Sequence, residues 1–143
     1  MLTFNSYSEK DTLEFARDFA LKLRGGDVVA FKGGMGMGKT VFVRGCSDVL
    51  HVETEVSSPT FSIVNDYGGP VNVYHFDMYR VESLDSLYST GFFDYLNENS
   101  ILFIEWSENI ENVLPENTIT VEFVRGAEDT ERSITISGGD GRW

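Results

Sequence analysis

The chain has 143 residues, of which 41% are hydrophobic and 13% aromatic, and this is enough for one domain with a packed core. Its 23 acidic residues against 11 lysines and arginines leave a formal net charge of −12. Such a charge argues against independent tight binding to nucleic acid or to an anionic membrane, because both need a basic surface. The acidity either serves solubility or offers a face to a basic protein partner, and composition leaves both open.

The cysteine content and the length of the apolar runs indicate the cellular compartment in which the protein is expected. The lone cysteine, Cys46, cannot form an internal disulfide and is expected to be a core residue, and two histidines with one cysteine exclude a zinc cluster. No apolar run approaches the length of a membrane span, and residues 1–11 lack the basic-then-apolar pattern of a signal peptide. We therefore expect a cytoplasmic protein without a membrane partner.

The first predicted elements lead into and out of a glycine-rich loop. Apolar residues recur at helical spacing over residues 8–23, where Ser8 starts a capping-box pattern and the glycines at 25–26 end the helix. Residues 28–31 are continuously apolar, as in a strand that is buried on both faces. A second helix is predicted over residues 40–50, directly after the loop.

The loop between this strand and this helix has the complete pattern G-x-x-x-x-G-K-[ST]. Glycines let the backbone curl its N–H groups around phosphate oxygens, and the following helix directs its positive end at the same anion. Lys39 is expected to reach the β- and γ-phosphates, and the hydroxyl of Thr40 is a hard oxygen ligand for Mg²⁺. The predicted cofactors are therefore ATP and Mg²⁺, bound by Gly33, Gly36, Met37, Gly38, Lys39, Thr40 and Val41.

The rest of the chain alternates short apolar segments with turn residues. The predicted elements are strands at 61–67, 72–77, 101–104, 119–123 and 134–136, and a helix at 84–96 with a break near Gly91. The last two strands are expected to pair antiparallel. The predicted fold is an α/β P-loop NTPase, a single domain over residues 1–137 with a flexible tail at 138–143. Its central, mainly parallel sheet is flanked by helices and has an antiparallel C-terminal edge.

Two carboxylates follow or end predicted strands. Glu105 follows the strand at 101–104, and if that strand lies parallel to the P-loop strand, Glu105 comes near the magnesium; the alternative is an exposed glutamate. His75 and Asp77 share one face of their strand, which allows a His–Asp pair or a carboxylate directed at the γ-phosphate with a histidine behind it. The alternative for Asp77 is a cap or an ion pair with Arg80.

A polar loop, Ser57-Ser58-Pro59-Thr60, precedes the strand at 61–67. Threonine-bearing loops sense the γ-phosphate in other P-loop proteins, and an ordinary turn explains the same residues. Trp106, directly after Glu105, is predicted to be a packing residue.

Four motifs resemble, in order and spacing, those of the TsaE (YjeE) family, the bacterial ATPases that serve the synthesis of threonylcarbamoyladenosine in tRNA. They are the P-loop, Ser58-Pro59-Thr60-Phe61, His75-Phe76-Asp77-Met78-Tyr79-Arg80 and Ile104-Glu105-Trp106, and the likeness extends from Ser8 to Arg132. The resemblance implies that Asp77, Thr60 and Glu105 are catalytic: Asp77 is the carboxylate needed for hydrolysis, and the Thr60 loop is a switch. It also implies that Thr40 and Glu105 ligate magnesium, and that Glu9 and Arg132 lie near the nucleotide base or ribose.

By the same resemblance, the chain acts with a complex of TsaB and TsaD. TsaD transfers the threonylcarbamoyl group, ATP hydrolysis supports turnover, and the chain meets tRNA only through the complex. Hydrolysis by the isolated chain is expected to be weak. Two alternatives stay open: a small-molecule kinase, which needs a second substrate pocket, and a nucleotide-gated binding module with little hydrolysis.

Overall fold

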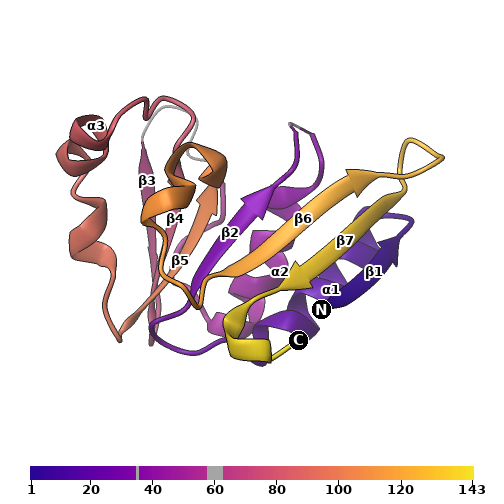
Figure 1. Cartoon of the computed structure of the whole chain (residues 1–143). Coiled ribbons are helices and arrows are strands. Elements are labelled where there is room, and N and C mark those ends of the chain that lie inside the picture. Colours follow the sequence, from indigo (N-terminus) through magenta and orange to yellow (C-terminus); the bar gives the residue numbers. More distant parts are fainter. Residues whose placement is uncertain (35, 58–62) are drawn as a thin grey trace.

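The computed structural model describes residues 1–34, 36–57 and 63–143. In these residues seven strands form one sheet with helices on both faces (Figure 1). The strands are β1 (Leu2–Ser6), β2 (Val28–Lys32), β3 (Val64–Gly68), β4 (Asn72–Asp77), β5 (Ser100–Glu105), β6 (Ile119–Arg125) and β7 (Arg132–Ser137). The α-helices are α1 (Glu9–Ala20), α2 (Lys39–Leu50) and α3 (Leu84–Ser89), and the 3₁₀ helices are η1 (Phe92–Tyr95), η2 (Ser107–Val113) and η3 (Gly139–Gly141).

The strand order is β1-β7-β6-β2-β5-β4-β3, and the four central strands β6, β2, β5 and β4 are parallel. The predicted antiparallel C-terminal edge is confirmed by the pairing of β6 with β7. Two features differ from the prediction. β1 extends this edge by pairing with β7, and β3 makes the opposite edge antiparallel by pairing with β4. β1 is short and mostly exposed, so its sequence carries little of the alternation that marks a half-buried strand.

The two faces of the sheet carry separate hydrophobic cores. α1 and α2 pack on each other behind the sheet in Figure 1, and Phe42 of α2 contacts Phe31 of β2 edge to face. The other core joins α3, η1 and η2 to the opposite face, where Leu102, Ile104 and Phe76 are buried. β2 and β5 are therefore apolar on both faces, as their continuous apolar sequences predict.

Local sequence explains where the helices begin and end. The side chain of Ser8 accepts a 3.1 Å hydrogen bond from the N–H of Asp11 and caps α1 as predicted, although α1 ends at Ala20. The predicted break near Gly91 is confirmed, because α3 and η1 are separate helices on either side of it. Cys46 is buried in α2, in agreement with its predicted place in the core.

The C-terminal segment, residues 138–143, was predicted to be a flexible tail. In the structure it packs on the domain. Arg142 donates two hydrogen bonds of 2.8 Å to the carboxylate of Asp27, which is 5% exposed. Trp143 stacks on Phe19 of α1 with 4.9 Å between the ring centroids. A buried carboxylate needs a cation, and an aromatic ring gains by leaving water, so both side chains hold the segment in place. The domain boundary at residue 137 stays a prediction.

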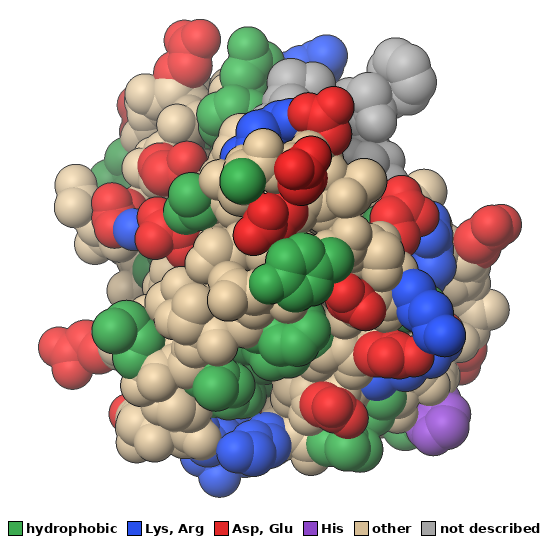
Figure 2. All heavy atoms as spheres, turned by 90° about the vertical axis from the view of Figure 1, so that its right-hand side faces the viewer, with side chains coloured by type: hydrophobic (Ala, Val, Ile, Leu, Met, Phe, Trp, Pro, Cys, Tyr) green, Lys and Arg blue, Asp and Glu red, His purple; other side chains and the backbone are tan. Residues whose placement is uncertain are grey.

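The surface is acidic, as the composition requires. Figure 2 shows acidic side chains spread over one face of the molecule, with lysines and arginines in a few separate groups. In the part of the chain that the structure describes, no helix is both long and apolar enough to cross a bilayer.

Candidate nucleotide site

The glycine loop connects the carboxyl end of β2 to the amino end of α2. Gly38 is the N-cap of α2 with a φ of 99°, and as a glycine it has no side chain to bond the first N–H groups of the helix. A Cβ atom on Gly36 or Gly38 would meet no described atom within 4 Å. Gly33 is needed for a different reason: its φ is 128°, and a Cβ there would lie 2.9 Å from the carbonyl oxygen of Phe123. Strand, loop and helix therefore have the arrangement that the motif requires.

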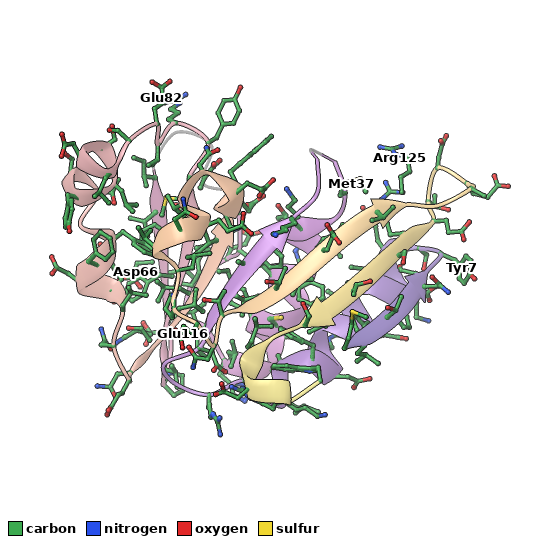
Figure 3. The ribbon with its side chains drawn as sticks, viewed as in Figure 1. Tyr7, Met37, Asp66, Glu82, Glu116 and Arg125 are labelled. Atoms are coloured by element: carbon green, nitrogen blue, oxygen red, sulfur yellow. The ribbon has the colours of Figure 1, made fainter. Side chains whose placement is uncertain are left out.

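A cleft of about 800 Å³ lies beside this loop, within the size range of small-molecule sites. In Figure 3, Met37 of the loop lies at the same end of the molecule as Arg125, which ends β6, and Glu116 lies at the opposite end. The cleft is thus at the carboxyl end of the parallel strands, where open α/β sheets bind their ligands. It brings together the predicted residues Glu9, Gly36, Met37, Gly38, Lys39, Thr40, Val41, Asp77, Glu105 and Arg132.

Among the described residues, one predicted residue, Gly33, is not found in the lining of the cleft. Its carbonyl oxygen accepts a hydrogen bond from the ammonium group of Lys39. Thr60 and the rest of the predicted switch loop from Ser58 onward lie outside the described residues, and so does Met35. Of the strand predicted at 61–67, the structure shows β3 from Val64.

Asp77 and Glu105 are paired in register at the ends of β4 and β5. Paired residues on adjacent strands point to the same face of the sheet, so the two carboxylates stand side by side. The side chain of Asp77 accepts a 2.9 Å hydrogen bond from the N–H of Tyr79, where the chain turns out of β4. Within the described residues no ion pair joins Asp77 to Arg80, so of the two structural alternatives for Asp77 the capping contact is present and the ion pair is not.

His75 is fully buried and contacts Glu105. Its Nε2 atom lies 2.7 Å from Oε2 of Glu105, and its Nδ1 atom lies 2.8 Å from the hydroxyl oxygen of Tyr67. The His–Asp pair that the spacing of His75 and Asp77 allows is therefore not formed. Asp77 is engaged by the N–H two residues further along the chain, whereas the longer side chain of Glu105 reaches the imidazole from the neighbouring strand.

Trp106 packs against the core of α3, η1 and η2, as predicted, and it also lines the cleft, which that interpretation missed. Its ring centroid lies 4.9 Å from that of Tyr79 and 5.4 Å from the ammonium nitrogen of Lys39, close enough for a cation–π contact. A φ of 57° at Trp106 turns the chain away from β5 directly after Glu105. The sequence signal for this role was its position, one residue beyond a carboxylate at a strand end.

Glu9 and Arg132 come from distant parts of the sequence and line the same cleft. Glu9 is the first residue of α1, and Arg132 is the first residue of β7. Arg132 donates a 3.2 Å hydrogen bond to the carbonyl oxygen of Gly36, which fastens the start of β7 to the glycine loop. The cleft also includes four residues that were not predicted to lie in the site: Ser8, Thr12, Asp129 and Thr130.

Comparison with known proteins assigns the family. The sequence profile of the family described as "Threonylcarbamoyl adenosine biosynthesis protein TsaE" matches residues 6–134. The chain belongs to the TsaE family. It is 34% identical over 132 residues to the tRNA threonylcarbamoyladenosine biosynthesis protein TsaE of Treponema pallidum, a match that covers 92% of this chain and 97% of that protein. It is 42% identical over 126 residues to the protein of the same name from Rickettsia typhi, with 85% and 83% covered.

A solved structure shares the fold. The crystal structure of Bacillus subtilis YdiB matches with a TM-score of 0.79 at 29% identity, over 96% of this chain and 84% of that chain. The TsaE protein of Bacillus subtilis strain 168 is 32% identical over 143 residues, which covers 99% of this chain and 89% of that protein. These matches confirm the family that the motifs suggest, and the fold class predicted with it.

Proposed function

We propose that this chain is the ATP-binding and ATP-hydrolysing subunit required for threonylcarbamoyladenosine modification of tRNA, acting with a TsaB–TsaD complex in the cytoplasm. The observation that carries the proposal is the meeting, in one cleft, of the P-loop residues Lys39 and Thr40 with the neighbouring carboxylates Asp77 and Glu105. Membership of the TsaE family, whose description names threonylcarbamoyl adenosine biosynthesis, supports the pathway.

The donor groups of the cleft suit a nucleotide that carries magnesium. Cationic and acidic side chains lie together in it, as a polyanion bound with a divalent cation requires. Within the described residues, no group of three or more His, Cys, Asp or Glu side chains is placed to hold a metal ion. Magnesium commonly takes one or two protein oxygens and completes its shell with phosphate oxygens and water, so Thr40 and Glu105 are a sufficient protein contribution.

Each residue has a separate task in this proposal. The N–H groups of the glycine loop and the amino end of α2 bind the phosphates, and Lys39 contacts the β- and γ-phosphates. Magnesium, when bound, neutralises phosphate charge. Asp77 orients the attacking water and accepts its proton, which is the role of a general base. Glu9 and Arg132 hold the base or ribose, and the Thr60 loop responds to the γ-phosphate.

The partner complex is expected to complete the site. All the described helices and strands belong to the sheet or to the layers on its faces, and none of them forms a lid over the cleft. Where no described element covers the γ-phosphate, water surrounds it, and in this proposal the partner complex supplies the preorganisation. The acidic surface in Figure 2 suits a basic partner face, and such an association weakens as salt rises. Contact with tRNA is then made only through the complex.

The test compares phosphate release from ATP by the chain alone and with purified TsaB and TsaD, at low and high salt. We expect slow release alone, stimulation by the pair and a loss of stimulation at high salt. Equal rates in all four conditions would contradict the partner-dependent part of the proposal. Magnesium omission and Lys39→Ala serve as controls: omission should abolish release, and Lys39→Ala should slow it about 100-fold.

The same assay separates the two alternative functions. Phosphate transfer that needs an added small-molecule acceptor would indicate a kinase. ATP binding without release, even in the presence of both partners, would indicate a nucleotide-gated binding module. The carboxylates Asp77 and Glu105 at the cleft favour hydrolysis over both.

A further inference from the structure

A buried chain of contacts leads away from Glu105, behind the cleft. It starts at Oε2 of Glu105 in β5, passes through His75 in β4 and Tyr67 in β3, and ends at the backbone of Ser57. Oε2 is buried, although the side chain of Glu105 as a whole is 12% exposed. Oε2 therefore contacts His75, while the rest of the side chain lines the cleft. Neither His75 nor Tyr67 lines the cleft.

Hydrogen-bond chemistry assigns the protons along this series of contacts from Glu105 to Ser57. The hydroxyl of Tyr67 has one proton, and it donates that proton to the carbonyl oxygen of Ser57, which can only accept. Burial raises the pKa of Tyr67, which keeps the hydroxyl protonated at neutral pH. Nδ1 of His75, 2.8 Å away, must then donate to the Tyr67 oxygen. The 2.7 Å contact between Nε2 and Oε2 of Glu105 also needs a proton, because two bare acceptor atoms repel at that distance.

We propose that His75 and Tyr67 are positioning residues that hold Glu105 from behind. With both ring nitrogens engaged, the imidazole cannot rotate without losing two contacts, and it therefore fixes Oε2 at the back of the cleft. Glu105 then turns its other oxygen, Oε1, toward the place where it would ligate magnesium. The same contacts join this carboxylate to Ser57, so a displacement of the Ser57 backbone is transmitted to Glu105. Partners placed behind a metal ligand in this way orient the ligand and tune its affinity.

Tyr67→Phe is a clean variant for testing this role. It keeps the buried ring and removes only the hydroxyl. The carbonyl oxygen of Ser57 retains a 3.1 Å hydrogen bond from the side-chain amide of Asn65, so its acceptor is not left unpaired. Tyr74→Phe is the matched control: Tyr74 lies on β4 next to His75 but belongs to the core on the opposite face, where it contacts Tyr95.

The first test is nitrogen NMR of the isolated protein with ¹⁵N-labelled histidine. The sequence has two histidines, and the other, His51, is exposed, so the signals are separable. We expect a proton on Nδ1 of His75 that exchanges slowly in the wild type and in Tyr74→Phe, and whose signal shifts or is lost in Tyr67→Phe. An unprotonated Nδ1 in the wild type, or an unchanged signal in Tyr67→Phe, would overturn the proposal.

The second test measures coupling between the two ends of the chain of contacts. Glu105→Gln should shift the backbone amide signal of Ser57 in the wild-type background and leave it in place in the Tyr67→Phe background. Equal shifts in both backgrounds would mean that Glu105 reaches Ser57 by another route, which contradicts the proposed connection.

The third test rests on the proposed function and measures the magnesium concentration at half-maximal phosphate release. We expect that concentration to rise about 10-fold in Tyr67→Phe, with the KM for ATP unchanged, since removing a partner behind a metal ligand typically costs 10–100-fold. Tyr74→Phe should keep the wild-type value. An unchanged magnesium dependence in Tyr67→Phe would overturn the positioning role. If the wild type releases no phosphate, the proposed function fails, and the two NMR tests still decide whether the connection exists.

Discussion

Buried charge is paired at the amino end of the central strands, whereas at the carboxyl end the buried charge of Lys39 is unpaired among the described residues. At the amino end, Asp27 precedes β2, and both of its oxygens accept hydrogen bonds from Arg142, with a further one from the N–H of Arg24. At the carboxyl end, Lys39 is only 6% exposed, yet it forms no ion pair with any described residue. Its ammonium group contacts the carbonyl oxygen of Gly33 and the ring of Trp106 instead.

This difference shows where the fold is stabilised and where a ligand is accommodated. A buried charge that is neutralised within the chain holds two segments together, as Asp27 and Arg142 hold the C-terminal segment. A buried charge without a counterion costs stability, and an oppositely charged ligand offsets that cost. Uncompensated charge gathered in a cleft is therefore typical of a functional site. Substitutions at the two ends should accordingly affect different measured quantities.

The largest effect is expected from Asp77→Asn, which should lower phosphate release about 10²–10⁴-fold, the usual contribution of a general base. Nucleotide affinity should stay near the wild-type value, because the asparagine oxygen still accepts the hydrogen bond from Tyr79. Release is measured alongside the affinity for a fluorescent ATP analogue. Asp66→Asn is a matched control, since Asp66 also accepts from the N–H two residues ahead and lies away from the cleft. Normal hydrolysis by Asp77→Asn would make Asp77 a structural residue only.

Lys39→Ala is expected to slow phosphate release about 100-fold, the typical loss of one preorganised charge contact, and to weaken ATP binding. Its thermal stability should not fall below that of the wild type, because the variant loses a buried charge that has no counterion to leave unpaired. Lys32→Ala provides the comparison: Lys32 ends β2, and its partner Glu111 is largely exposed. Wild-type turnover by Lys39→Ala would contradict the assignment of the P-loop.

Arg142→Ala acts at the opposite end and should lower stability, with turnover per folded molecule unchanged. It leaves the buried Asp27 carboxylate without its cation, and we expect a loss of about 2–3 kcal/mol, below the range for fully buried pairs because water reaches Arg142. For a chain of this size the melting temperature should fall by about 5–10 °C. Calorimetry and the phosphate assay are run on the same preparation. A loss of turnover without a loss of stability would break the separation between the two ends.

The smallest effect is expected from Arg17→Ala, which removes an exposed ion pair between α1 and α2. The side chains of Arg17 and Asp48 are 46% and 48% exposed. Exposed pairs contribute roughly 0–1 kcal/mol, and salt screens them, so the stability change should be small and should shrink further at high salt. A change as large as that of Arg142→Ala would show that burial does not set the strength of these pairs.

Much of the site could be predicted because it is local in the sequence. The residues from Val28 to Leu50 form a strand, a loop and a helix whose apolar runs and glycine positions are read directly from the chain. The strand end at Glu105 was predicted for the same reason, since a fully apolar run leads up to it. β1 was missed because an exposed edge strand of five residues carries no clear pattern.

The sequence by itself determined the strand, glycine loop and helix from Val28 to Leu50, the parallel centre of the sheet and the family, because backbone conformation and burial at these positions depend on neighbouring residue types. Only the tertiary structure decided which polar groups meet. His75 contacts Glu105 and not Asp77, and the ring of Trp106 lies against the ammonium group of Lys39. Arg142 forms an ion pair with Asp27, which lies 115 positions away in the sequence. Such contacts depend on the order of the strands in the sheet and on the length of the side chains across it. The spacing of residues along the sequence does not determine which of them meet.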